Sequence, residues 1–473
     1  MHLKKISVGF SFLVILLLFL LNFSSTPVTD DYCMAYGFKN FGLMETVAYY
    51  NANWTPSIAY YFLGLWVLPF STLTNSFLIS FLSLILFLLF ILRSIFFLTR
   101  NNAGKDKILT TGVLIILLVS SLALVQSSVY FNSSSARALN PLGILRDWML
   151  SNFASLRDGQ ILLWAFSTPI TSFKIILTGA VVYFVISLNN RQSRKHKISF
   201  FQYQALFLIL SLFVGLMTES LLLITFLILR NSYDLFHKTK KVQPLFIILV
   251  SFAGLAGNYL ASGTQNRAVA YSRDSIRFYV SLFLGNIWQF IWMLSIIALI
   301  ALISHLFLVP RLTAPLRFPD GVRLNLRLLG IASLLSQLFI ETFVYPAAYH
   351  WFSLLLVCSI WFFVEIGSVE IKFLDNNKKK NLVTFLYGMV LILLLITLIH
   401  TINTASERKM NWSERSSSSL IAGVRDMKDI PALDNLGERL AQDLEITFPS
   451  IVPFSGLMEN FTMYCYRKLP IGF

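Results

Sequence analysis

The sequence predicts an all-α fold, a polytopic transmembrane helical bundle with 11 or 12 spans. Two observations predict it. Of the 473 residues, 56% are hydrophobic and only 13% are charged, whereas a soluble domain has about 45–50% apolar and about 25% charged residues. Long apolar runs also recur between residue 6 and residue 401, and many of them reach the roughly 20 residues that a helix needs to cross a bilayer.

The individual spans follow from the lengths of these runs. The runs that are long enough lie at about 6–23, 75–98, 108–129, 166–188, 243–260, 277–305, 326–344, 350–368 and 381–401. Shorter candidates lie at about 54–72, 200–217 and 219–230. The first run follows Lys4 and Lys5 and resembles a secretion signal, but no small-x-small cleavage motif comes after it. We therefore expect this run to stay in the protein as the first span.

The orientation of the bundle follows from its basic residues, which cluster in short loops. Four such loops lie at 191–197, 230–241, 311–327 and 372–380. Loops rich in Lys and Arg stay in the cytoplasm, and we expect the amino terminus to lie there too. The predicted non-cytoplasmic segments are then the first loop 24–53, the loops 131–165, 261–276 and 345–349, and the tail 402–473.

The charge of the tail supports this orientation. Residues 402–473 hold eight Lys and Arg against nine Asp and Glu, so their net charge is −1. The first 401 residues carry +16, and the whole chain carries +15. The excess charge lies in loops between spans, which argues against a nucleic-acid partner. We divide the chain into a transmembrane domain, 1–401, and a small non-cytoplasmic segment, 402–473.

One region fits the orientation less well. Residues 99–107 contain three basic side chains and should be cytoplasmic, which requires an odd number of spans after the first loop. The stretch 54–98 instead reads as two helices with a break at 71–75. Either 54–72 is partly re-entrant, or the basic loop departs from the charge rule, and both alternatives stay open.

The chain has three cysteines and lacks the common soluble-enzyme motifs. Cys33 and Cys465 both fall in predicted non-cytoplasmic segments, so they either pair or remain free thiols. Three cysteines cannot make a disulfide scaffold or a zinc ribbon. No Walker A loop, dinucleotide fingerprint or G-x-S-x-G elbow occurs in the sequence, which excludes the enzyme classes that these motifs mark.

Candidate catalytic acids lie at the predicted outer ends of spans. Asp30 and Asp31 follow the first span. Two adjacent carboxylates repel each other unless a cation or a proton offsets them, which suits a general base or a ligand for a hard divalent ion. The alternative is a solvated acidic pair beside a span. Glu219 lies between two short apolar runs, where it either acts on a substrate or pairs with a buried arginine.

Two further external segments carry candidate binding residues. Arg267, Arg273 and Arg277 accompany Ser, Thr and Asn side chains, and arginine forks bind phosphate through two hydrogen bonds. Ordinary interfacial arginines on lipid headgroups are the alternative. A short turn between two spans gathers an acid, an imidazole and aromatic side chains, which either position a substrate or form an interfacial aromatic belt. Its candidate residues are Glu341, Tyr345 and His350.

Four segments follow one another along the chain in an order that points to a known family. They are Asp30-Asp31-Tyr-Cys33 with Tyr49-Tyr-Asn-Ala-Asn-Trp54, Gly215-Leu-Met-Thr-Glu219, Gly257 to Arg267, and Asp443 to Ser450 with Glu459 to Tyr466. In this order they resemble the GT-C superfamily of polytopic glycosyltransferases, which includes protein O-mannosyltransferases and oligosaccharyltransferases. The resemblance covers most of the chain and is nearest to a bacterial branch, although Thr55-Pro-Ser57 stands where that branch has Gly-Arg.

The resemblance implies an inverting transfer of a sugar from a polyprenyl-phosphate donor to a cell-envelope glycan or lipid acceptor. The site would face outward from a bacterial plasma membrane. Asp31 or Asp30 would be the general base, and Arg267, with Arg273, would bind the donor phosphate. Some relatives use a divalent metal such as Mg²⁺ or Mn²⁺, which the acid pair permits without requiring it. Residues expected to position substrates are Trp54, Glu219, Glu341, Tyr345 and His350.

Two other functions remain open at this stage, as does a structural membrane protein without chemistry. A transporter or flippase for lipid-linked sugars predicts charges in the middle of spans and broken helices paired between two halves. Lys174 and Arg93 lie within or near spans, but no repeated pattern accompanies them. A polysaccharide polymerase or ligase would also use external arginines, yet it would not need an acid pair immediately after the first span.

Overall fold

The structure, a computed structural model, describes seven α-helices and one 3-10 helix. It covers residues 2–23, 43–45, 47–48, 76–99, 104–129, 276–312, 316–318, 320–343, 351–369 and 377–421, with single positions between 237 and 265. No strand occurs in these residues. The helices are α1 (His2–Phe23), α5 (Ser76–Leu98), α6 (Gly104–Val129), α14 (Ile276–Leu308), η6 (Val309–Arg311), α15 (Asp320–Phe343), α16 (Trp351–Gly367) and α17 (Asn377–Ile421).

Each of the seven α-helices contains or closely matches one apolar run of the sequence. The α-helical fold class is therefore confirmed for the described residues. By length and composition, two helical segments are able to cross a membrane, namely Phe290–Arg311 in α14 and η6, and Lys380–Ile399 in α17. Three shorter apolar segments lie at Lys5–Leu21, Leu84–Phe96 and Leu355–Gly367. The runs predicted at 54–72, 166–188, 200–217, 219–230 and 243–260 lie outside the continuous described segments.

Helix α17 is longer than the apolar run that predicted it. The run ends near residue 401, whereas the helix continues to Ile421. The added residues include good helix formers such as Ala, Glu, Arg, Lys and Met, and residues 402–422 contain no Gly or Pro. Because helices commonly end just before a glycine, the polar stretch extends the helix instead of ending it.

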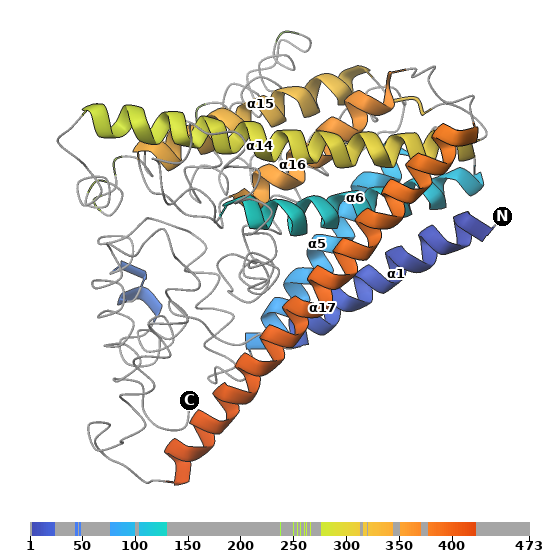
Figure 1. The fold of residues 1–473 in the computed structure, drawn as a ribbon. Coiled ribbons are helices and arrows are strands. Elements are labelled where there is room, and N and C mark those ends of the chain that lie inside the picture. The colour runs from blue at the N-terminus through green and yellow to red at the C-terminus, as the bar shows by residue number, and fades with distance from the viewer. Residues whose placement is uncertain are drawn as a thin grey trace.

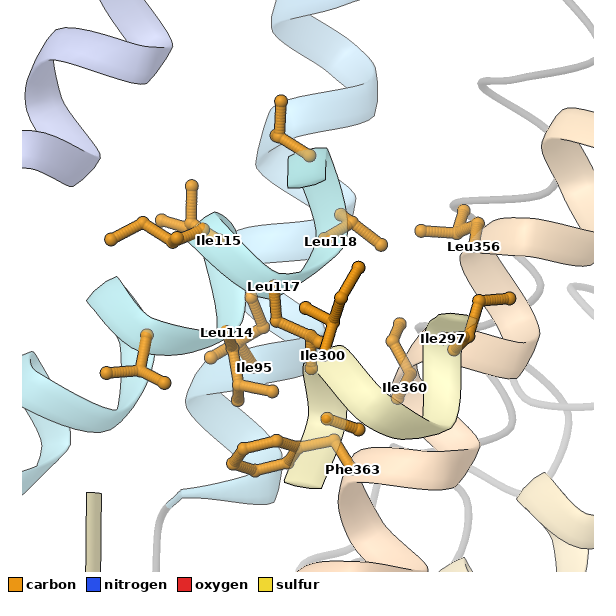
Figure 2. Close-up of a cluster of buried hydrophobic side chains, with 14 of the residues drawn as sticks. Ile95, Leu114, Ile115, Leu117, Leu118, Ile297, Ile300, Leu356, Ile360 and Phe363 are labelled. Atoms are coloured by element: carbon orange, nitrogen blue, oxygen red, sulfur yellow. The ribbon is translucent and has the colours of Figure 1, made fainter. Parts of the chain in front are cut away.

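Helix α6 lies at the centre of the described helices. It packs against α1, α5, α14, α16 and α17, and every residue from 112 to 121 is buried. A helix that is apolar on all sides is one that neighbours surround. Figure 2 shows side chains of α5, α6, α14 and α16 meeting in this cluster, among them Ile95, Leu117, Ile300 and Phe363.

Small residues let α1 and α6 approach closely. A Cβ atom at Gly112 of α6 would lie 2.7 Å from Ser11 Oγ and 3.6 Å from the Ser7 carbonyl oxygen of α1. The Ser11 hydroxyl already donates a hydrogen bond to that carbonyl at 2.7 Å. Small residues four apart are typical of helix contacts inside membranes, and Ser7 and Ser11 have this spacing against Gly112.

The helix ends that carry basic residues meet at one end of the bundle, which we call the basic end. There the Ser7 hydroxyl of α1 lies 3.4 Å from the Tyr387 hydroxyl of α17. The Tyr387 ring stacks on Phe307 of α14 at 3.8 Å. Lys107 Nζ of α6 lies 5.8 Å from the centroid of the Phe96 ring of α5. Helices α1, α6, α15 and α17 therefore begin at this end, and α5, α14 and α16 finish there (Figure 1).

The direction of α5 bears on the ambiguous region after the first span. Helix α1 leaves the basic end and finishes at Phe23, and α5 returns to that end from Ser76. The chain thus leaves α1 and enters α5 at the opposite end, which we call the far end. Among the described helices, α5 brings the chain back to the basic end, and it begins directly after the predicted break at 71–75.

The described helices diverge from the basic end toward the far end. In Figure 1, α1, α5 and the long α17 run in one direction, and α14, α15, α16 and α6 run in another. The two sets meet nearer the basic end, where α1 packs on α6 beside Ser11 and Gly112 and α17 meets α14 through Tyr387 and Phe307. The far ends of the two sets consequently lie apart.

Candidate functional site

Most of the candidate site residues lie outside the described part of the chain. Only the backbone of Glu341 is described, in the last turn of α15. The structure therefore leaves the predicted catalytic and binding roles as predictions. The candidates outside the described residues are Asp30, Asp31, Trp54, Glu219, Arg267, Arg273, Tyr345 and His350.

The backbone of Glu341 lies at the far end of the bundle. Helix α15 begins at Asp320 at the basic end, and at 1.5 Å per residue the 21 steps to Glu341 span about 31 Å. Helix α16 begins at Trp351 and returns to the basic end. Residues 344–350, which include Tyr345 and His350, thus connect two helices at the far end, as the sequence predicted for this turn.

Two other candidate segments are joined to helix ends that the structure describes. Asp30 follows the end of α1 at Phe23 by seven residues, and Arg273 precedes the start of α14 at Ile276 by three. Both helix ends belong to the far end of the bundle. An extended chain spans at most about 3.3–3.6 Å per residue, so each candidate stays within reach of its own helix end.

The helix ends beside these candidates belong to two different sets. The start of α14 and the far ends of α15 and α16 lie in one set, next to Arg273, Glu341 and His350 (Figure 1). The end of α1, next to Asp30 and Asp31, lies in the other. The described helix ends beside the arginine and Glu341 segments thus belong to one set, and the helix end that precedes the acid pair belongs to the other.

An ion cluster at the basic end is chemistry that the sequence analysis did not single out. Glu365 of α16 accepts a hydrogen bond from Arg327 Nε at 2.9 Å, and Arg327 NH2 lies 2.8 Å from the same oxygen. Arg323 NH2 lies 3.5 Å from the other carboxylate oxygen. Trp361 Nε1 donates to Glu365 at 3.3 Å. The sequence offered one signal for this cluster, which is that Glu365 is a lone acid inside an apolar run. Such an acid usually has a partner.

A second cluster ties α14 to α17 and α1. The Arg311 guanidinium donates to the Phe307 carbonyl oxygen and to the Thr384 hydroxyl, the latter at 3.0 Å. Its central carbon lies 3.8 Å from the centroid of the Phe307 ring. Since Phe307 also stacks on Tyr387, one arginine and two aromatic rings join these helices. This contact holds the basic end together.

Metal-binding chemistry is not present among the described side chains. No group of three or more His, Cys, Asp or Glu residues in the described segments is placed to hold a metal ion. Cys358 is a free, fully buried thiol within α16. Cys33, Cys465 and the acid pair lie outside the described residues, so the predictions made for them stay as they are.

Comparisons with known proteins add no family to this picture. No family model, no curated protein and no solved structure matches the chain. The class that the structure itself defines is a helical protein with two segments able to cross a membrane, in the part of the chain that is described. The resemblance to GT-C glycosyltransferases therefore rests on the sequence motifs.

Proposed function

We propose that this chain is a multi-pass membrane glycosyltransferase of the GT-C type. It moves a sugar from a polyprenyl-phosphate donor to a glycan or lipid acceptor on the non-cytoplasmic face. The observation that carries the proposal is that three candidate segments are joined to four helix ends, all at the same end of the bundle. They adjoin the end of α1, the start of α14, the end of α15 and the start of α16, all opposite the basic end.

The exposed faces of the helices support membrane embedding. On α17, every exposed residue from 382 to 399 is apolar, including Phe385 at 64% and Leu382 at 58% exposure. On α1, Phe12 is 69% exposed and its exposed neighbours from residue 6 onward are apolar or glycine. A soluble protein rarely exposes such continuous apolar surface. A lipid bilayer is the environment that matches the exposed apolar surface of these two helices.

The buried polar residues agree with this reading. Ser94, Thr110 and Ser121 are fully or almost fully buried and donate to the carbonyl oxygen one turn earlier. Small hydroxyl side chains are common between helices in membranes, where the backbone satisfies them. The described helices thus place small polar groups inside and large apolar groups outside.

The charge distribution supports the orientation. Exposed or half-exposed basic residues at the basic end include Lys5, Lys107, Arg317, Arg327 and Lys380. Basic helix ends remain in the cytoplasm, so the far end, where the candidate segments emerge, faces outward. A polyprenyl-phosphate donor presents its sugar in the outer leaflet and would enter there from the bilayer.

The proposed reaction is a single inverting displacement. The acceptor hydroxyl oxygen bonds to the anomeric carbon of the sugar while the bond from that carbon to the phosphate oxygen breaks. Asp31 or Asp30 takes the hydroxyl proton as general base. The electron pair of the broken bond leaves with the polyprenyl phosphate, whose negative charge Arg267 stabilises. In relatives that use Mg²⁺ or Mn²⁺ the acid pair would be the ligand, and no step here requires the ion.

The test replaces the candidate base in the full chain. Asp31→Asn and Asp30→Asn are expressed separately, and transfer of labelled sugar from polyprenyl phosphate to envelope glycan is measured. Loss of the general base should lower the rate about 10²- to 10⁴-fold in one of them. Asp320→Asn is the matched control, because this carboxylate is fully exposed at the opposite end. Full activity in both test variants would sink the assignment.

A flippase for lipid-linked sugars is the second candidate. The divergence of two helix sets from a common end favours it, because alternating access moves one bundle against another (Figure 1). A deletion strain separates the two functions. Donor that accumulates in the inner leaflet indicates a flippase, whereas donor that accumulates in the outer leaflet with unmodified acceptor indicates the transferase.

A further inference from the structure

Arginines at the basic end outnumber the acids described around them. Between residue 309 and the second turn of α15 there are four arginines, against the two carboxylates of Asp320 and Glu365. Within the described residues, Arg311 bonds only to a carbonyl and a hydroxyl oxygen. Within the described residues this surface therefore carries two more arginines than carboxylates. We call it the arginine surface, and its members are Arg311, Arg317, Arg323 and Arg327.

Arg317 is held outward by its two neighbours. Leu316 and Phe318 are 7% and 9% exposed, whereas Arg317 between them is exposed. Both neighbours pack on the last turn of α16, where a Cβ atom at Gly367 would lie 3.0 Å from Phe318 and 3.6 Å from Leu316. Phe318 also meets Phe363 edge to face. The guanidinium of Arg317 thus projects from a fixed support.

Arg323 adds a second guanidinium beside the same turn of α16. It lies 3.5 Å from Glu365 and 3.6 Å from Asp320. Arg327 makes the shorter contacts to Glu365, and the buried Nε atom of Arg323 has no hydrogen-bond partner among the described groups. Arg323 contacts Glu365, and the two neighbours of Arg317 pack on Gly367, two residues further along α16. Two arginines with donors to spare consequently flank one helix end.

We propose that Arg317 and Arg323 bind the phosphate of an anionic phospholipid in the cytoplasmic leaflet. The proposal rests on the membrane embedding and orientation given above. Guanidinium forks match phosphate oxygens and form charge-assisted hydrogen bonds with them. The surface of α15 next to Arg323 fits acyl chains, since Leu324, Ile331 and Leu335 are 43%, 42% and 61% exposed. A lipid supplies both the anion and the apolar chains, whereas free phosphate supplies only the first.

The test measures which lipids stay with the protein. Full-length protein is placed in nanodiscs of equal parts phosphatidylglycerol and phosphatidylcholine, and the lipids retained after mild detergent washing are counted by mass spectrometry. The native chain should retain phosphatidylglycerol preferentially. The double change Arg317→Gln and Arg323→Gln should weaken that retention about tenfold, which corresponds to about 1.4 kcal/mol. Arg93→Gln, which removes one positive charge at an exposed arginine of α5, is the control for a general effect of charge.

A second double variant keeps the test informative if the first does not fold. Arg317→Lys with Arg323→Lys retains both charges and loses the planar forks, so it should keep part of the preference. Equal retention by the native and glutamine variants overturns the proposal. An equal loss in Arg93→Gln overturns it too, because it would show a diffuse effect of charge. Displacement by millimolar glycerol phosphate would assign the surface to a free anion and contradict a lipid.

The outcome also separates this site from the function proposed for the chain. Protein recovered in solution without detergent would overturn membrane embedding and the lipid site together. Embedded protein that transfers sugar yet shows no phosphatidylglycerol preference would overturn only the lipid site. Embedded protein that shows the preference and transfers no sugar supports the lipid site and counts against the transferase.

Discussion

Trp361 of α16 occupies the space that a side chain at position 330 of α15 would need. The three atoms nearest to a Cβ built on Gly330 all belong to the indole ring of Trp361. The indole Nε1 donates to Glu365 at 3.3 Å, and the ring stacks on Phe362 with centroids 5.1 Å apart. The ring is therefore held in place, and α15 and α16 approach as closely as they do because residue 330 has no side chain.

Gly330→Ala should destabilise the protein. Alanine in place of glycine normally stabilises a helix by about 1 kcal/mol, but here the new methyl group overlaps a fixed ring, and overpacking costs about 1–3 kcal/mol. We expect a lower midpoint of thermal unfolding for protein purified in detergent. Gly388→Ala in α17 is the matched control, because nothing lies within 4 Å of a Cβ there, and it should unfold no earlier than the native chain. Equal midpoints for the two variants would contradict the contact.

Glu365 should couple more strongly to Arg327 than to Arg323. The contacts to Arg327 are 2.8 and 2.9 Å, and the contact to Arg323 is 3.5 Å. The Glu365 and Arg327 side chains are 23% and 48% exposed, so solvent limits the coupling to about 0.5–1 kcal/mol. Double-mutant cycles with Glu365→Gln and each arginine changed to Gln measure both couplings by thermal unfolding. A larger value for Arg323 would refute the geometry described here.

A reporter inserted after residue 104 should lie in the cytoplasm. Helix α5 ends and α6 begins at the basic end, beside the amino-terminal turns of α1, and basic helix ends stay inside. A fluorescent protein at this site should fluoresce, and an alkaline phosphatase at this site should be inactive. The same reporters after residue 421, at the far end of α17, should give the opposite pattern. An active phosphatase after residue 104 would mean that the basic loop departs from the charge rule.

Local apolar patterning was sufficient to predict the described helices. The runs at 6–23 and 75–98 match α1 and α5 to within a few residues, because the length of an apolar run limits where a membrane helix begins and ends. The pairing of helices was not predictable, since it depends on contacts between distant residues. Gly112 against Ser11 and Gly330 against Trp361 are examples. The residues next to Gly112 and Gly330 in the sequence do not distinguish these glycines from one that faces open space, such as Gly388.

The candidate site was predictable only in outline. The sequence predicted Glu341 near the end of a helix, and α15, which ends at Phe343, agrees with this; the prediction that this end faces outward stays a prediction. The partners of Glu365 were missed, although Arg323 and Arg327 were recognised as basic loop residues. An ion pair across two helices depends on their rotation about their own axes, and a charge count per loop carries no information about that rotation.

Arg267 should be required for transfer through its guanidinium fork and not only through its charge. Removing a group that stabilises charge on the leaving phosphate costs about 10²- to 10³-fold in rate, and we expect a loss of that size in kcat/KM for the polyprenyl-phosphate sugar in Arg267→Gln. Arg267→Lys retains the charge but cannot form a bidentate contact, so its activity should lie between those of the native chain and the glutamine variant. Arg93→Gln controls for the loss of one positive charge on an exposed face of α5 and should retain native kcat/KM. Native kcat/KM in Arg267→Gln would remove this residue from the donor site, whereas equal losses in the lysine and glutamine variants would show that the fork, rather than the charge, makes the contribution.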